Sequence, residues 1–213
     1  MSVRSGSKNH RAAGAGPLEK TMTTLPNPVT TSAAEKEKLL SLLRETKERF
    51  LGSFAGINDE QSRCCPAEEK WSILDTVEHL TTAEQTMLKR ITDTRRPRTA
   101  ATSNREEIFL RAVADRSRKS ESPETARPRG RFADLSEART QFETARDSTI
   151  RFVEQCTEDL RATEATHPHP LAGVVTTYEM VIIMAKHAER HALQIDEIKN
   201  CPAFRAVPAG SKG

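Results

Sequence analysis

Apolar residues recur every three or four positions along four long stretches of this 213-residue chain, which is the spacing of an amphipathic helix. The stretches span residues 32–54, 72–91, 136–160 and 176–200, and no stretch alternates apolar and polar residues as a strand would. Three of them start with a Ser or Thr followed three residues later by an acidic residue, the pattern of a capping box: Ser32, Ser72 and Thr176. The sequence therefore predicts an all-α fold, a four-helix bundle.

The segments outside the helices predict flexible chain at both ends. Residues 1–31 hold few large apolar side chains and are rich in Gly, Ser, Thr and Pro, so we expect a disordered N-terminal tail. Residues 201–213 are expected to form a second disordered tail, and the bundle domain is predicted to span residues 32–200. Translation can begin at Met1 or at Met22, and the sequence does not choose between them.

Residues 94–134 form a long, basic connection that we expect to be partly disordered. Between residues 94 and 131 there are eleven Lys and Arg and five acidic residues, a net charge of +6. A short helical pattern at 105–115 is followed by a tract from Ser122, rich in Pro and Gly, that predicts a mobile loop. This connection and the one before the last helix are long enough to cross over, so neighbouring helices need not be antiparallel.

Charge and composition argue against several classes of partner. The net charge of +3 gives no strong case for a polyanion, and the basic connection offers almost no aromatic residue beyond Phe109 for stacking bases. We therefore favour a solvated linker over a nucleic-acid surface. No apolar run reaches the roughly 18–20 residues of a membrane span. The four cysteines form no CxxC pair, which indicates reduced thiols in a cytoplasmic protein.

Two histidines stand out on the stretch 176–200. His187 and His191 are four residues apart, so they lie one turn apart on the same helix face, together with apolar residues such as Met180 and Ile183. Two interpretations stay open. Both can be core histidines, each hydrogen-bonded to a neighbour, or both can bind a metal ion that satisfies one nitrogen of each ring.

A metal site would need a third ligand from another helix, and only His79 supplies an imidazole there. His10 lies in the tail, and His167 and His169 lie in a proline-rich loop. Three imidazoles leave coordination positions open, which is typical of a catalytic site, and zinc, nickel or iron would accept them. The metalloprotease pattern HExxH is excluded because Ala188 follows the first histidine.

Two motifs of the chain resemble those of the DinB-like superfamily of metal-dependent helical bundles. Residues 71–80 read WSILDTVEHL and resemble its "WS…E.l.HL" motif. Residues 169–173 read HPLAG, residues 187–195 read HAERHALQI, and together they resemble its "HP..G … H..RH..QI" motif. The resemblance implies an up-down-down-up bundle, often a homodimer, with a divalent metal held by His79, His187 and His191.

Four further residues have alternative roles. Glu84 lies on the inner stripe of its helix and is a candidate for lining the pocket or orienting a ligand; the alternative is a carboxylate paired with Lys or Arg. Gln194 faces inward and is a candidate for supporting a ligand. Arg190 is expected to flank the pocket or a dimer surface, and Trp71 to be a packing residue at the start of its helix rather than a substrate platform.

The resemblance also frames the functional hypotheses. The better understood members of the superfamily are transferases and isomerases that use a low-molecular-weight thiol such as bacillithiol or mycothiol, and others are regarded as hydrolases. We therefore expect a metal-dependent thiol transferase or hydrolase acting on a small molecule. The alternative is a non-catalytic, metal-binding stress-response or interaction dimer. No side chain in the sequence identifies itself as a general base.

Overall fold

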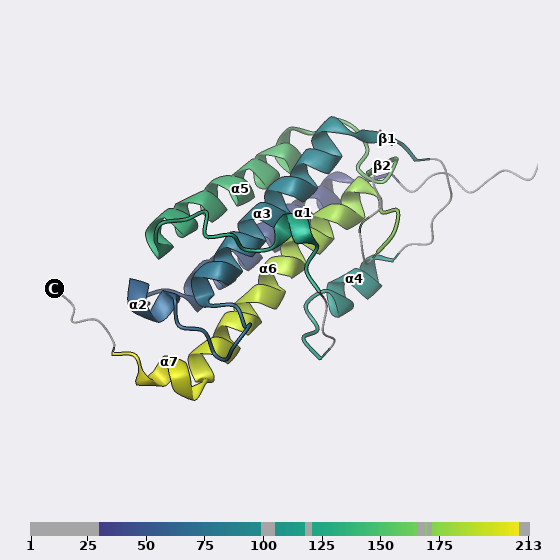
Figure 1. The fold of residues 1–213 in the computed structure, drawn as a ribbon. Helices are drawn as coiled ribbons and strands as arrows, with labels where there is room; N and C mark the ends of the chain where they lie inside the picture. The colour runs from purple at the N-terminus through teal and green to yellow at the C-terminus, as the bar shows by residue number, and fades with distance from the viewer. Residues whose placement is uncertain (1–29, 99–104, 118–120, 166–168, 170–171, 209–213) are drawn as a thin grey trace, which may run out of the picture.

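The computed structural model describes residues 30–98, 105–117, 121–165, 169 and 172–208 (Figure 1). Of the tails predicted over residues 1–31 and 201–213, residues 1–29 and 209–213 lie outside the described residues. In chain order, the elements are α1 (Ala33–Ser53), α2 (Asp59–Ser62), α3 (Ile73–Asp93), β1 (Arg95–Pro97), α4 (Glu106–Ala112), the 3-10 turn η1 (Glu124–Ala126), α5 (Leu135–Gln155), β2 (Thr163–Ala165), α6 (Thr177–Asn200) and α7 (Pro202–Ala206).

The long helices α1, α3, α5 and α6 form a four-helix bundle with up-down-down-up topology, as predicted (Figure 1). The start of α1 lies beside the chain that follows α5, because Thr31 donates its backbone N–H to Asp159 at 2.9 Å. At the other end, the backbone N–H of Leu135, where α5 begins, donates to Asp59 just after α1. Since α3 and α5 run in the same direction, residues 94–134 cross from one end of the bundle to the other.

The predicted helix starts are confirmed by side-chain caps. Ser32, Ser72 and Thr176 each accept the backbone N–H three residues on, and each completes a capping box. The helix predicted over 136–160 ends earlier, at Gln155. Its last carbonyls accept hydrogen bonds from the Lys36 ammonium, at 2.8 and 3.0 Å, and the following chain is extended. Capping by a cation from another helix is not visible in local periodicity.

Several short elements were not predicted. β1 and β2 pair as an antiparallel ribbon with Arg95 opposite Ala165, although the sequence indicated no strand. Residues 202–206, expected in a disordered tail, form α7. The tract from Ser122, expected to be a mobile loop, instead follows a defined path across α3, held by hydrogen bonds described below. Elements of three to five residues are too short to show a helical or strand period.

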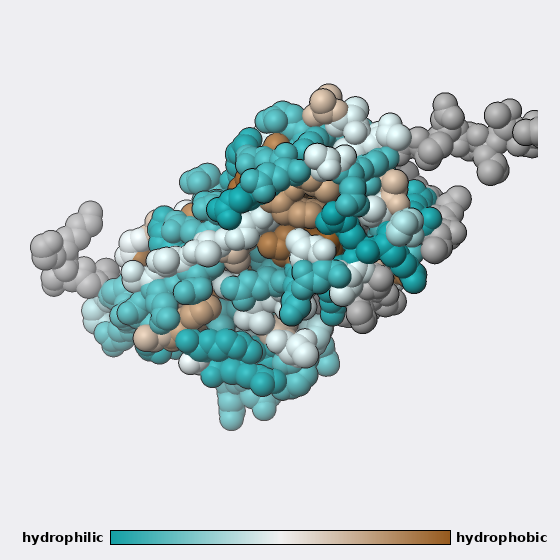
Figure 2. All heavy atoms as spheres, turned by 90° about the horizontal axis from the view of Figure 1, so that it is seen from above, coloured by the Kyte–Doolittle hydropathy of each residue, from teal (hydrophilic) through white to brown (hydrophobic). Residues whose placement is uncertain are grey.

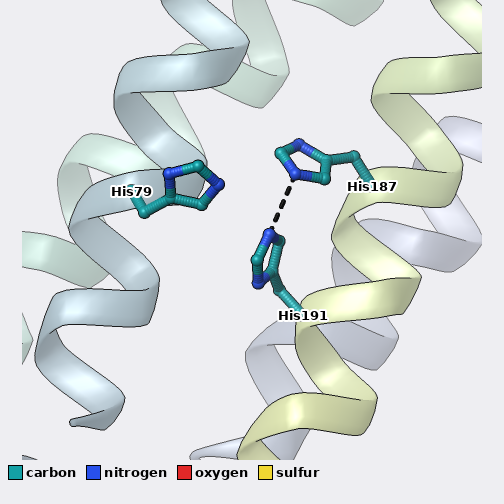
Figure 3. A group of neighbouring side chains, drawn as sticks. All are labelled: His79, His187 and His191. Carbon is teal, nitrogen blue, oxygen red and sulfur yellow. Dashed lines mark hydrogen bonds between the residues drawn. The ribbon is translucent and has the colours of Figure 1, made fainter. Parts of the chain in front are cut away.

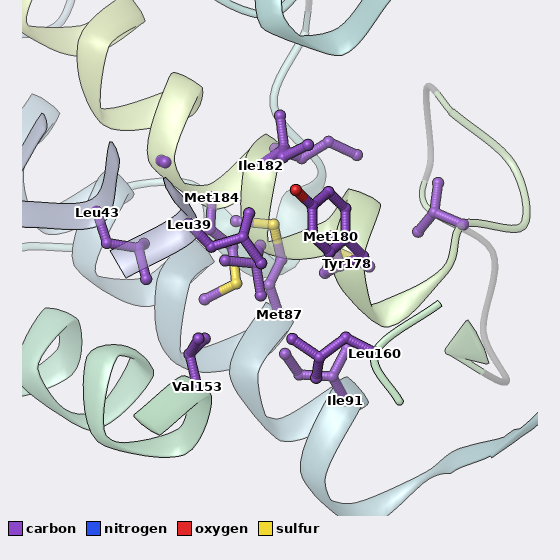
Figure 4. Close-up of a cluster of buried hydrophobic side chains, with 14 of the residues drawn as sticks. Leu39, Leu43, Met87, Ile91, Val153, Leu160, Tyr178, Met180, Ile182 and Met184 are labelled. Carbon is purple, nitrogen blue, oxygen red and sulfur yellow. The ribbon is translucent and has the colours of Figure 1, made fainter. Parts of the chain in front are cut away.

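The apolar core is divided into two clusters along the bundle axis. One cluster gathers residues from the start of α1, the end of α3 and the first half of α6, including Leu43, Met87 and Met184 (Figure 4). The other lies towards α2 and α7 and includes Phe50, Leu80 and Phe142. Between them, polar side chains from all four long helices cross the middle of the bundle.

The face drawn in Figure 2 is largely hydrophilic, and apolar residues show mainly near its centre. None of the helices that the structure describes combines the length and the apolar character that crossing a bilayer requires. The four cysteines, all within the described ranges, form no disulfide with one another.

Candidate metal centre

The structure brings His79 of α3 together with His187 and His191 of α6 (Figure 3). The ring centroids are 5.3 Å apart for His79 and His187, 4.8 Å for His79 and His191, and 4.5 Å for the pair on α6. His79 and His191 are buried. His79, which the helical phase put at the edge of the apolar stripe, is thus turned into the space between the two helices.

Two of the rings donate their single hydrogen from Nδ1, so Nε2 of each can only accept, and Nε2 of His191 lies within hydrogen-bond distance of Nε2 of His187 (Figure 3). His79 donates its Nδ1 hydrogen to the carbonyl oxygen of Ala126 at 2.7 Å, and His191 donates its Nδ1 hydrogen to Oε1 of Gln194 at 2.9 Å. A neutral imidazole carries a single N–H, so in both rings Nε2 presents only a lone pair. These are the nitrogen and the tautomer with which histidine commonly binds a metal ion.

Burial keeps the cluster uncharged. The pKa values of His187 and His191 lie well below the usual 6.5, first because both rings are buried and then because neighbouring imidazoles would repel a second positive charge. The pKa of His79 is also lowered by burial, against the opposing effect of its hydrogen bond to Ala126. Three neutral imidazoles at neutral pH are the form that coordinates a cation.

The geometry of the cluster fits a metal ion. One ligand nitrogen from each ring lies within 4.8 Å of the other two, and Nε2 of His187 is 2.9 Å from Nε2 of His191. Nitrogens bound to one tetrahedral zinc ion at about 2.0–2.1 Å lie about 3.3 Å apart, so small ring rotations suffice. Among the described residues, the buried Nδ1 of His187 has no hydrogen-bond partner, so the cluster is not satisfied by itself.

The residue next to His79 secures the carbonyl that orients it. The buried carboxylate of Glu78 accepts the backbone N–H groups of Arg129 and Arg131, at 2.6 and 3.0 Å, and a guanidinium N–H of Arg131 at 2.5 Å. These bonds fix residues 122–131 against α3, with Ala126 over the His79 ring. Local sequence patterns give no sign of this role of Glu78, because its partners lie some fifty positions away in an apparent linker.

Gln194, predicted to support a ligand, lies beside His191 and is itself held in place. Its Oε1 accepts from His191 and also from Arg116 at 3.3 Å. Arg116 in turn forms a bidentate ion pair with Glu197, at 2.6 and 2.7 Å. Two donors directed at the same atom support its assignment as the amide oxygen. Arg116 comes from the basic connection, so that connection contributes to both sides of the histidine cluster.

Glu84 does not have the role that was suggested for it in the pocket. Its carboxylate is fully buried and pairs with Arg146 of α5, with Nε–Oε1 and Nη2–Oε2 distances of 2.7 and 2.8 Å. The remaining Arg146 hydrogens go to Leu43 O and Thr46 Oγ1 on α1 and to Met184 O on α6. The alternative interpretation, a carboxylate paired with a basic residue, is the correct one.

A cavity of about 1190 Å³ opens beside the three histidines. Trp71, for which packing was favoured over a role as a substrate platform, lines this cavity with its ring centroid 4.7 Å from that of His79. Arg190 lines the cavity as well and donates to the backbone carbonyl of Asp115. His169, set aside as a loop residue, is a fourth imidazole on the wall, and burial lowers its pKa.

Comparisons with known proteins agree with this arrangement. A family model described as the DinB superfamily matches residues 42–195. The chain is 25% identical over 160 residues to YuaE, an uncharacterized protein of Bacillus subtilis (strain 168), and the match covers 75% of this chain and 96% of YuaE. Among solved structures it resembles YfiT from Bacillus subtilis, a probable metal-dependent hydrolase with an unusual four-helix bundle topology. That match has a TM-score of 0.50 and 16% identity over 79% of this chain and 87% of YfiT, so it shows a shared fold.

Proposed function

The chain belongs to the DinB superfamily, and we propose that it is a divalent-metal-dependent enzyme, best described as a hydrolase of small molecules. The observation that carries the proposal is the convergence of three neutral imidazoles on the wall of a cavity of about 1190 Å³. A purely structural metal site is closed by four protein ligands, whereas three ligands beside a cavity leave room for a substrate. The description of YfiT as a probable metal-dependent hydrolase supports the same reaction class.

His79, His187 and His191 would hold the ion, and zinc, nickel and iron all accept such a donor set. When bound, a divalent ion lowers the pKa of a water molecule or thiol and polarises a carbonyl oxygen. The chain contributes orientation: Ala126 O fixes the His79 ring and Gln194 fixes the His191 ring. Fixed rings keep the open positions directed at the cavity.

His169 is the residue we assign to hydrogen bonding with the substrate. Its Nδ1 accepts the backbone N–H of Ala172 at 3.2 Å, so the proton of the neutral ring lies on Nε2. A neutral imidazole N–H in a partly dry cavity can donate to an oxygen that gains negative charge during the reaction. Its position on the cavity wall, outside the three-histidine cluster, separates this role from metal binding.

A second reaction, transfer to a low-molecular-weight thiol, is favoured by one observation. No carboxylate of the described residues hydrogen-bonds a histidine of the cluster. Of the carboxylates that line the cavity, Glu197 is paired with Arg116, and Glu69 and Glu121 are exposed to solvent. Water as a nucleophile usually passes its proton to a general base, whereas a thiol with a pKa near 8.5 ionises more readily beside a metal.

One set of assays separates these reactions. The metal-loaded protein and a chelator-treated sample are incubated with activated esters, amides and electrophilic alkyl halides, each with and without an added thiol. Turnover that requires metal alone supports hydrolysis, and turnover that requires metal and thiol supports transfer. A metal-loaded protein inactive in every combination would favour the non-catalytic alternative. The expected homodimer is a separate proposal, which sedimentation equilibrium tests.

A further inference from the structure

One face of α3 leads away from the histidine cluster along the cavity wall. His79, Ala83, Thr86, Met87 and Arg90 all line the cavity, and their spacing of 4, 7, 8 and 11 residues keeps them on one stripe. Ala83 and Met87 are buried, and the Thr86 hydroxyl donates to a backbone carbonyl one turn earlier. At 1.5 Å per residue, Arg90 lies about 16 Å along the axis from His79.

Among the described residues, no carboxylate forms an ion pair with the guanidinium at the end of this stripe. Arg116 and Arg127, which also line the cavity, are paired with Glu197 and Glu124 respectively. The half-buried side chain of Arg90, in contrast, has no ion pair or hydrogen bond within the part of the chain that the structure describes. A cation taken partly out of water without a counter-charge is unfavourable, and an anion would relieve that cost.

The His169 imidazole, which lines the same cavity, supplies no counter-charge to Arg90. Burial lowers the pKa of His169, and the positive charge of Arg90 lowers it further, so the two side chains interact electrostatically. His169 is therefore neutral beside Arg90. His169 also lowers the pKa of His187, so its ring lies on the cavity wall within electrostatic range of both the histidine cluster and Arg90, and the stripe ends in the Arg90 cation alone.

We propose that this stripe of the cavity wall, from His79 to Arg90, is a subsite for an elongated substrate. The apolar stem of the substrate lies over Ala83 and Met87, and its anionic end group pairs with Arg90. The placement of the reacting end at the three histidines rests on the proposed function; the recognition of the anionic end does not. A guanidinium presents two parallel N–H groups that match a carboxylate or a phosphate, which defines the chemical class of the end group.

The fluorescence of Trp71 provides the test, because it is the only tryptophan of the chain and lines the cavity. The full-length protein without added metal is titrated with octanoate, octyl phosphate and octan-1-ol. We expect at least one anion to bind about tenfold or more tightly than the alcohol, since hydrogen bonds between charged groups are stronger than neutral ones. The tighter of the two anions identifies the end group as carboxylate or phosphate.

Two variants locate the effect. Arg90→Gln is expected to abolish the preference for the anion, and Arg127→Gln, which removes a different cavity-lining guanidinium, is expected to keep it. Thermal unfolding monitored by circular dichroism verifies that both variants fold. Equal binding of all three compounds to the unmodified chain, no binding of any, or a preference that survives in Arg90→Gln would overturn the proposal. Because these titrations need no metal, a failed metal analysis would reject the proposed function and leave this result standing.

Discussion

The Arg146 cluster and the histidine cluster both interrupt the apolar core at the middle of the bundle, but only the first is satisfied by its own residues. All five guanidinium hydrogens of Arg146 have acceptors on α1, α3 and α6. The Thr149 hydroxyl donates a further hydrogen bond to the Glu84 carboxylate at 2.9 Å. In the histidine cluster, Nε2 of His191 meets only Nε2 of His187, at 2.9 Å, and the buried Nδ1 of His187 lacks any described partner.

The difference separates a structural role from a binding role. A closed network of buried charges fixes how the four helices pack and leaves no unused donor or acceptor for a ligand. An open cluster of neutral imidazoles next to a cavity is less satisfied, and its remaining lone pairs converge. Burial and polarity are therefore shared by both clusters, and the number of unused donors and acceptors distinguishes them.

Removal of the Arg146 side chain should have the largest effect on stability. Arg146→Met leaves the Glu84 carboxylate buried without its cation, which costs about 3–5 kcal/mol of unfolding free energy. Urea denaturation measures the loss. Arg44→Met is the matched control, because Arg44 pairs with Glu154 at the surface and such pairs contribute roughly 0–1 kcal/mol. A loss below 1 kcal/mol for Arg146→Met would show that the network does not stabilise the bundle.

Metal addition should stabilise the protein through the open cluster alone. At a free zinc concentration 100 times the dissociation constant, the unfolding free energy of the chelator-treated protein should rise by about 2.7 kcal/mol. Thermal unfolding with and without zinc provides the measurement. His191→Ala should lose most of the increment, and Arg44→Met should retain it. An equal increment in His191→Ala would place the ion elsewhere.

The residues that orient the rings should have smaller effects on metal affinity. Glu78→Gln weakens the hold on residues 122–131, and Gln194→Ala removes the acceptor of His191, so each should reduce zinc affinity about 10–100-fold. Competition with a chromogenic chelator measures this. Glu164→Gln is the control, since Glu164 is equally buried and pairs with Arg96 in the ribbon. Comparable loss in Glu164→Gln would mean that the effect is a general one on folding.

Acidification should have the smallest effect on the unfolding free energy for each histidine involved. The native pKa values of His79, His187 and His191 lie below 6.5, so these rings stay neutral in the folded chain while they gain protons in the unfolded chain. Stability is therefore complete above pH 6.5 and falls as the pH drops below it. At pH 6.0 each ring contributes a loss of roughly 1 kcal/mol or less. Urea titrations of His187→Ala across this range should show a shallower dependence.

The sequence predicts the four long helices and the inward face shared by His187 and His191 because both depend on local periodicity, whereas the participation of His79 was implied by the family resemblance. The phase of His187 and His191 on α6 follows from a spacing of four residues, and the capping pairs mark helix starts. Glu84 was located correctly on an inner face, but its partner Arg146 lies 62 positions away. Helical phase shows that a carboxylate is buried; it does not show which helix supplies the counter-charge.

The residues that support the site could not be predicted either, because their contacts are also long-range. Residues 122–131 look like a linker because they are charged and rich in proline and glycine, and their order depends on the Glu78 carboxylate. His169 was set aside because a proline-rich loop has no periodic face, and its place on the cavity wall follows from the path of the chain before α6. Long-range polar contacts leave little trace in a single sequence.

Metal analysis of the purified chain and of His187→Ala is the most direct test of the open cluster. Protein prepared without chelators should contain about one divalent ion per chain by elemental analysis, and His187→Ala should lose most of it while circular dichroism shows an intact bundle. Arg127→Gln, which leaves the cluster unchanged, should keep the ion. Full metal content in a folded His187→Ala variant would contradict the assignment of the three histidines as the metal site.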